Sequence, residues 1–195
     1  MRIILALIMV GFAGWAFRGS STAVTMNVET NASKVEWAAT KKTGFHQGII
    51  KVKGGDVQIE NGKLTGGKFV IDVNSINATD MVDNPADNNL VKHIKSKDFL
   101  ETETFPDATF DIKKVDYKDD KNVMLNGTLT MKGVSVPLSF PATINNADEK
   151  RFFGFAHFTI DRTLWNVMYD TNRASRDVNI GVYLFATPST PAAIK

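Results

Sequence analysis

Residues 57–73, VQIENGKLTGGKFVIDV, decide the fold class of this chain. Val57 and Ile59 alternate with polar residues, and they are followed by Asn61-Gly62, a pair that tolerates the positive φ angles of a type I′ turn. The return segment runs from Leu64 to Val73 and carries Phe69, Ile71 and Val73 on one face. Two segments of period two joined by Asn-Gly predict a β-hairpin. Gly66-Gly67 inside the return segment predicts a bulge.

The same alternation continues on both sides of this hairpin. A turn is expected at Gly54-Gly55, a second hairpin turn at Lys132-Gly133 and a bulge near Lys113-Lys114. About eight strands are predicted, and most of their connections are of hairpin length, which is typical of an antiparallel barrel or sandwich. Apart from residues 57–73, the alternating segments are residues 34–42, 46–53, 108–117, 123–131, 134–140 and 178–185. Residues 152–160 are apolar at nearly every position, as expected of a strand covered on both sides.

One segment has helical spacing instead. Leu90, His93 and Ile94 recur at steps of three and four, with lysines on the other side, and Pro106 forbids continuation beyond it. The pattern predicts one short amphipathic helix over residues 88–96, packed against the β body or across one end of it.

The composition bounds the size of the protein and the partners it can have. The chain has 195 residues, of which 43% are hydrophobic and 23% charged, as expected of one globular domain. The formal net charge of +2 argues against a nucleic-acid partner. There are no cysteines, so thiol catalysis and disulfides are excluded, and only three histidines could supply imidazole ligands. No metal site is expected.

The N-terminus predicts export. Met1-Arg2 is followed by an apolar run over residues 3–17, which is shorter than a bilayer-spanning helix needs, and this favours a signal peptide cleaved after Ala23. The alternative is an uncleaved anchor in the inner membrane; either way the folded part would lie outside the cytoplasm. The expected organisation is a signal peptide over residues 1–23, a linker over 24–33, the domain over 34–186 and a polar tail over 187–195.

Motifs that carry catalysis are missing. The chain has no Gly-rich phosphate loop, nucleophile elbow or His-x-x-x-His pair. His157, Asp161 and Arg162 form the most polar group near an apolar strand, and a catalytic dyad could be imagined there. A structural role for Arg162, pairing with a carboxylate or capping carbonyls at a strand end, is the favoured interpretation. No catalytic residue is therefore assigned.

The chain is rich in large apolar residues, with thirteen Phe, three Trp and seven Met. An eight-stranded barrel can fill its interior with such side chains or can enclose a chamber for one small ligand. Composition leaves both alternatives open.

Several short motifs occur in order between Lys34 and Ala186. They are Gly66-Gly67-x-Phe69-x-Ile71-Asp72, His93-Ile94-Lys95-Ser96-x-Asp98-Phe99, Phe105-Pro106-x-Ala108-Thr109-Phe110, Leu129-Thr130-x-Lys132-Gly133-Val134 and Phe158-x-Ile160-Asp161-Arg162-x-x-Trp165. Each motif alone is weak, but in combination they resemble the YceI-like, polyisoprenoid-binding family.

The resemblance implies an all-β fold: an extended, eight-stranded, antiparallel, lipocalin-like barrel with one short helix, located in the periplasm. Its tunnel would hold a long amphiphilic lipid, namely a polyisoprenoid, an isoprenoid quinone or a fatty-acid derivative, and the resemblance implies neither catalysis nor a cofactor. Contact with a membrane surface and a homodimer are further expectations. Two alternatives stay open: a stress-response or interaction module with a filled core, and a lipid-modifying enzyme that uses the His157 group.

The expected lipid-binding residues follow from the alternation, although it does not tell which parity of each strand faces inward. The expected lining residues are Trp37, Phe69, Ile71, Phe110, Leu129, Met131, Phe140, Phe153, Phe155, Phe158 and Trp165. The expected polar end of the pocket consists of His46, His93 and Arg162, of which Arg162 would suit a phosphate or carbonyl head group.

Overall fold

A computed structural model describes residues 23–81 and 89–189 of the chain. In this part the chain forms nine strands, one α-helix and two short 3-10 helices. The strands are β1 (Ala23–Val28), β2 (Lys34–Lys41), β3 (Gly44–Glu60), β4 (Lys63–Asp72), β5 (Asp107–Tyr117), β6 (Asn122–Met131), β7 (Val134–Ala147), β8 (Phe152–Asp161) and β9 (Ala174–Pro188). The helical segments are η1 (Val73–Ser75), α1 (Asn89–Lys95) and η2 (Arg162–Trp165).

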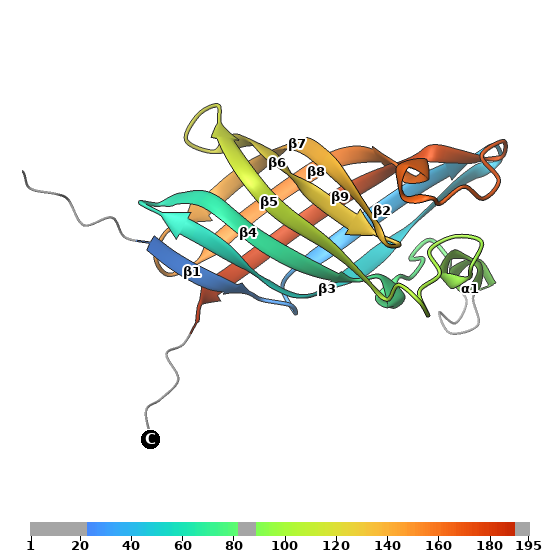
Figure 1. Ribbon diagram of the computed structural model, residues 1–195, viewed down its shortest axis with the longest axis horizontal. Helices are drawn as coiled ribbons and strands as arrows, with labels where there is room; N and C mark the ends of the chain where they lie inside the picture. Colours follow the sequence, from blue (N-terminus) through green and yellow to red (C-terminus); the bar gives the residue numbers. More distant parts are fainter. Residues whose placement is uncertain (1–22, 82–88, 190–195) are drawn as a thin grey trace, which may run out of the picture.

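Eight of the strands close into an antiparallel barrel (Figure 1). The order around the wall is β3-β2-β9-β8-β7-β6-β5-β4, and β4 pairs again with β3. The predicted eight-stranded barrel with one short helix is thus confirmed, with β1 as an additional strand. Because the sheet closes on itself, its eight strands share one inner face. The side chains that point inward from these strands therefore surround a single interior.

The linker predicted over residues 24–33 is wrong, because β1 is part of the wall. β1 pairs with residues 56–60 of β3 and with residues 186–188 of β9. β2 pairs with other parts of the same two strands, so β1 and β2 both lie between β3 and β9. Val24, Met26 and Val28 alternate with polar residues, and Met26 is completely buried. The predicted boundary after residue 186 is also too early, since β9 runs to Pro188.

The glycine pairs have different roles. The turn predicted at Gly54-Gly55 is wrong: β3 passes through it as one strand, and the register with β4 shifts there. Gly55 has a φ of +141°, and a Cβ on it would lie 2.2 Å from the carbonyl oxygen of Lys68, so the close approach of β4 requires glycine. The bulge predicted near Gly66-Gly67 is confirmed by a register shift between Gln58 and Ile59.

Both predicted hairpin turns are confirmed. Asn61 and Gly62 have φ angles of 52° and 74°, and Lys132 and Gly133 have 49° and 73°. Positive φ at both central residues is the geometry of a type I′ turn, whose twist matches that of the flanking strands. The predicted bulge near Lys113 is present as well, as a register shift between Ile112 and Lys114.

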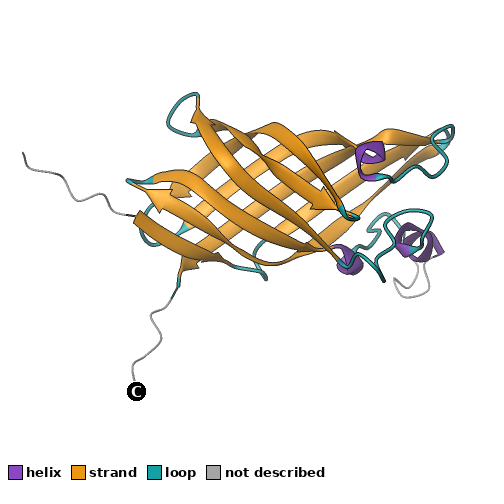
Figure 2. Cartoon of the chain, viewed as in Figure 1, coloured by secondary structure: helices purple, strands orange, loops and turns teal. Residues whose placement is uncertain are grey.

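All three helical segments lie at one end of the barrel (Figure 2). A small apolar cluster of Trp37, Ile76, Ala78 and Val91 attaches α1 and the segment before it to the barrel. At the opposite end, residues such as Met26 and Val57 close the interior, and both are fully buried. Among the described residues, no helix has the length and apolarity needed to cross a membrane. The expected signal peptide falls on residues 1–22, outside the described residues, apart from Ala23.

Candidate functional site

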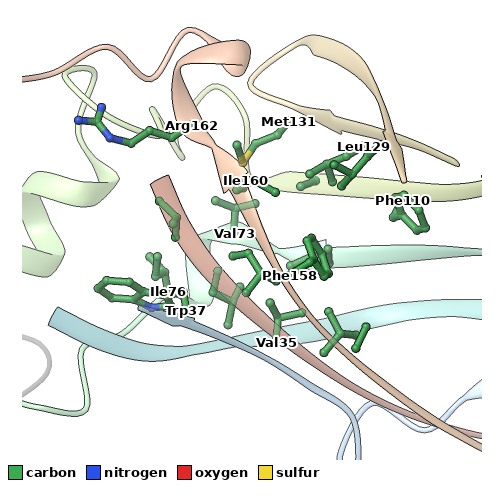
Figure 3. Close-up of a pocket in the computed structure, with 18 of the residues that line it drawn as sticks. Val35, Trp37, Val73, Ile76, Phe110, Leu129, Met131, Phe158, Ile160 and Arg162 are labelled. Carbon is green, nitrogen blue, oxygen red and sulfur yellow. The ribbon is translucent and has the colours of Figure 1, made fainter. Parts of the chain in front are cut away.

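The barrel encloses a cavity of about 390 Å³. This volume lies in the range of small-molecule pockets, roughly 300–1,000 Å³. Its wall consists almost entirely of apolar side chains, and Figure 3 shows them in a row, with Trp37, Ile76 and Arg162 towards one end and Phe110 towards the other. The interior is therefore hollow, which decides between the two alternatives that composition left open.

Most of the expected lining residues lie on the wall of this cavity. They come from six different strands, and alternation along each strand turns them to the same side. The residues so placed are Trp37, Phe69, Ile71, Phe110, Leu129, Met131, Phe140 and Phe158. Phe140 and Phe158 stack on each other with ring centroids 3.9 Å apart, and Phe110 contacts Phe140 at 5.2 Å.

Three expected lining residues lie elsewhere. The ring of Phe153 stacks on Phe185 with centroids 4.3 Å apart, on the outward parity of β8. Phe155 borders the cavity through its strand, but its ring belongs to the same outer group, beside Tyr183. Trp165 is completely buried, and its indole Nε1–H donates to the carbonyl oxygen of Leu129 at 3.0 Å, so it supports the wall from behind.

The wall also contains residues that sequence reasoning did not select. Even-numbered residues of β8 face inward, and a pure alternation argument could have identified them only if the direction of one of them had been known. The same holds for the inward residues of β9. No strand pattern marks Phe99 or Tyr169, which come from loops. The main additional wall residues are Val35, Phe99, Phe152, Ala156, Ile160, Tyr169, Val178, Ile180, Val182 and Leu184.

The cavity opens at the α1 end. Its deep end is bounded by buried residues such as Leu64, Ile144 and Leu184, whereas the lining at the α1 end includes side chains exposed to solvent. We call this open end the mouth; its residues are Lys41, His46, His93, Arg162 and Tyr169. The three residues expected at the polar end are therefore brought together around one opening.

Arg162 is a buried cation held by backbone oxygens. Its Nε donates to the carbonyl of Ser175 at 2.9 Å, Nη1 donates to that of Val167, and Nη2 donates to those of Tyr169 at 2.8 Å and Ala174 at 3.3 Å. None of these four acceptors is a carboxylate. Burial lowers the pKa of Arg162, and the negative charges of Asp161 and Asp170 act in the opposite direction. The guanidinium thus fastens the η2–β9 loop and presents positive charge beside the mouth.

His46 belongs to a polar triad on the opposite side of the mouth. Lys41 Nζ lies 2.8 Å from His46 Nε2, and His46 Nδ1 lies 2.8 Å from a carboxylate oxygen of Asp80. An ammonium group can only donate, so this network fits a neutral ring with its proton on Nδ1. Burial raises the pKa of Asp80, but the bonds from the Gln47 amide and His46 outweigh it and the net shift is downward.

His93 stands in an aromatic cluster that spans the mouth. Its ring meets Tyr169 edge-on at 4.6 Å and Phe99 at 5.2 Å, and Nε2 lies 3.2 Å from a carboxylate oxygen of Asp98. The guanidinium carbon of Arg162 lies 5.6 Å from the centre of the Phe99 ring. The cluster therefore links α1 to the loop after η2.

The His157, Asp161 and Arg162 group does not form a site. His157 and Asp161 are four residues apart on β8, which is about 13 Å along a strand. His157 faces outward and contacts the Tyr183 hydroxyl at 3.1 Å. Bonds from Thr163 and Arg176 lower the pKa of Asp161 despite its partial burial. In the part of the chain that the structure describes, no three His, Asp or Glu side chains are grouped to hold a metal ion.

Part of the chain is similar to known bacterial proteins. A UPF0312 protein of Shewanella baltica is 36% identical over 88 residues, which are 45% of this chain and 44% of that protein. A second UPF0312 protein, from Pseudomonas putida, is 34% identical over 101 residues, which are 52% of this chain and 50% of that protein. The matched part of the chain thus spans about half the length of these relatives.

A solved structure supports the fold assignment. The crystal structure of Burkholderia cenocepacia BcnA superposes with a TM-score of 0.70 at 23% identity, covering 82% of this chain and 99% of that one. This likeness concerns the fold alone. The sequence profile described as the YceI-like domain matches residues 18–186. The protein therefore belongs to the YceI-like family.

Proposed function

We propose that this protein binds and carries a long amphiphilic lipid in its barrel cavity. The ligand class is a polyisoprenoid, an isoprenoid quinone or a fatty-acid derivative, and the place of action is the periplasm. The observation that carries the proposal is the apolar cavity that runs from the mouth towards the deep end of the barrel. Burial of each methylene of a chain in such a cavity contributes about 0.8 kcal/mol, so affinity needs few polar contacts.

The mouth suits the polar end of such a ligand. The positively charged guanidinium of Arg162 donates to backbone carbonyl oxygens. A carbonyl or phosphate oxygen of a ligand placed beside it would be stabilised by this charge. His46 and His93 lie on other sides of the same opening. An amphiphile bound with its chain inside would therefore have its head group among these three residues.

A catalytic role has no support in the geometry. An enzyme that modifies a lipid needs a positioned acid, base or nucleophile, and the His157, Asp161 and Arg162 side chains do not converge. The alternative of a module with a filled core conflicts with the hollow interior. We therefore infer a binding protein that needs no cofactor.

Mass spectrometry of organic extracts from protein purified without detergent tests the proposal. We expect one lipid species in near-stoichiometric amount. The cavity-blocking variant is Ala156→Phe, because Ala156 faces the cavity and is buried. The matched control is Ala38→Phe, since Ala38 points to the outside of β2.

The blocked variant should lose the lipid while the control retains it. Ala142→Phe, directly across from Ala156 on β7, serves as a second blocking variant if the first one folds poorly. Circular dichroism of each variant verifies the barrel. Wild-type protein that repeatedly yields no lipid, or equal lipid in the blocked and control variants, would refute the proposal.

A further inference from the structure

The exposed large apolar side chains of this protein gather at one place. Within residues 23–81 and 89–189 there are five of them, and the most exposed are Met168 (58%), Phe45 (56%) and Leu164 (53%). Met81 and Tyr169 complete the set. We call these five residues the rim. Clustering of such side chains in an otherwise polar surface marks an interaction site.

Each rim residue is tied to the mouth by a neighbour. Phe45 immediately precedes His46, and Met81 immediately follows Asp80, the partner of His46. Leu164 lies in η2, two residues after Arg162, and Met168 immediately precedes Tyr169, whose ring packs on His93. The rim residues thus come from three separate segments, which Figure 1 shows at the right-hand end of the barrel, around the side where α1 lies.

Positive charge accompanies the apolar rim. The turn that presents Phe45 contains Lys41 and Lys42 and no carboxylate between residues 40 and 45. Residues 89–97, which include α1, contain three lysines and no Asp or Glu. Three carboxylates near the mouth have local partners: Asp80 contacts His46, Asp98 contacts His93, and Asp170 pairs with Arg173.

We propose that the rim is a docking surface for an anionic lipid bilayer, through which the ligand passes directly between membrane and cavity. This inference rests on the proposed function. Apolar side chains inserted among the head groups, with lysines beside the phosphates, are the usual composition of a membrane-surface contact. Docking at the mouth would let the apolar chain of the ligand move without crossing water.

A bilayer fits the rim better than a second copy of the chain does. In a two-fold contact the same patch meets itself, so mouth-to-mouth docking would bring the lysines of the two copies together. The rim is also continuous with the cavity, whereas a protein partner seated there would cover the only opening identified among the described residues.

Flotation of the purified protein with vesicles tests the inference. One set contains phosphatidylethanolamine with phosphatidylglycerol, and the other contains phosphatidylcholine alone. We expect binding to the anionic set, and a drop of about tenfold for the double variant Leu164→Ser, Met168→Ser, because two exposed apolar side chains are removed. Both residues are exposed, so the barrel should be unaffected.

A matched pair of charge variants tests whether the lysines beside the rim, and not positive charge elsewhere on the protein, are needed for vesicle binding. Lys42→Glu, in the turn between β2 and β3 that presents Phe45, should weaken flotation, and Lys150→Glu, in the turn between β7 and β8 at the other end of the barrel, should not. Equal effects of the two variants, or wild-type protein that fails to float, would overturn the inference.

Lipid content, measured in the same preparations, separates this inference from the proposed function. Protein that carries lipid but never floats refutes the docking surface and leaves the carrier. Protein that floats through the rim but never contains lipid refutes the carrier. Sedimentation that shows a dimer converted to monomer by the Leu164→Ser, Met168→Ser variant, without vesicle binding, would assign the rim to self-association and overturn the inference.

Discussion

At the scale of single residues, Arg162 shows how a buried charge can hold a loop in place. Its four acceptors are backbone carbonyls on Val167, Tyr169, Ala174 and Ser175. A guanidinium has five N–H groups in a fixed plane, and a shorter cation could not reach all four carbonyls. The loop after η2 therefore depends on this one side chain.

Replacement of Arg162 by Met should destabilise the protein by about 3 kcal/mol, because carbonyl groups at the mouth lose a charged donor. The free energy of unfolding in urea measures this loss. Arg176→Met is the control, since Arg176 pairs with Asp161 at the surface and such pairs contribute about 0–1 kcal/mol. A loss below about 1 kcal/mol for Arg162→Met would contradict the assigned role.

Gly48 permits a close contact between β3 and the segment after η1. A Cβ at this position would lie 1.8 Å from the carbonyl oxygen of Asn77, which accepts the indole N–H of Trp37 at 3.0 Å. Gly48→Ala should therefore displace the 76–79 segment and cost about 2–3 kcal/mol in unfolding experiments. Gly54→Ala is the control, because nothing lies within 4 Å of its Cβ position. Equal stability of the two variants would show that the segment yields without cost.

At the scale of elements, β1 is what sequence reasoning missed. Hairpin turns with Asn-Gly or Lys-Gly and strands of clear alternation were predictable, because the local sequence contains the turn geometry and the period. β1 alternates over only six residues, and its partners are residues 56–60 and 186–188. Such distant pairing has no local signal, so the sequence alone predicts a linker where β1 lies.

The same reason limits the prediction of the site. β8 is apolar on nearly every residue from Phe152 to Ile160, so alternation cannot tell its two faces apart. Phe153 and Phe155 face outward because β8 must present Phe152 and Ala156 to the interior in register with β7 and β9. On β4 and β6 the expected lining residues Phe69, Ile71, Leu129 and Met131 do lie on the cavity wall.

Met26→Ala tests whether β1 belongs to the barrel. Met26 is fully buried, and truncation of a buried Met typically costs about 2–5 kcal/mol. Thr25→Ala, one position away on the exposed face, should change the free energy of unfolding by less than about 0.5 kcal/mol. If β1 were a mere linker, the two variants would behave alike.

The turn between β5 and β6 predicts a dependence on pH. The Asn122 side chain and the Asn122 and Lys121 amides donate to Asp119 and lower its pKa to about 2, from an ordinary value near 3.9. The unfolded chain binds the proton more readily, so the stabilisation is complete above about pH 4 and is lost as the pH falls towards about 2. Asp119→Asn should be less stable than wild type at neutral pH.

Urea unfolding at several pH values measures this effect. The stability difference between wild type and Asp119→Asn should shrink between about pH 4 and pH 2. Asp120→Asn in the same turn controls for the loss of charge. A difference that stays constant over this range would show that the carboxylate of Asp119 has no special role.

At the scale of the whole molecule, the barrel surrounds an apolar cavity large enough for a small ligand. Its apolar wall gains dispersion contacts only when something occupies the cavity. A ligand that binds only the folded barrel stabilises it in proportion to the logarithm of its concentration over its dissociation constant. The free energy of unfolding should therefore rise with the fraction of barrels that contain a ligand.

The proposed function predicts that removal of bound lipid by organic extraction and refolding lowers the thermal midpoint, and that readdition of the extracted lipid restores it. Differential scanning calorimetry measures both changes. In the Ala156→Phe variant the cavity is obstructed, so extraction should leave the midpoint unchanged. An equal decrease in wild type and variant would mean that the treatment damages the barrel itself.

The pairing of β1 with both β3 and β9 has a consequence for how the chain acquires its fold. Val28 pairs with Ala186, so the wall cannot close until almost the whole described chain is available. Contacts at such large sequence separation form late and slowly. A chain with this topology can close its barrel only once β9 is available, because β9 is the strand that pairs with both β2 and β8.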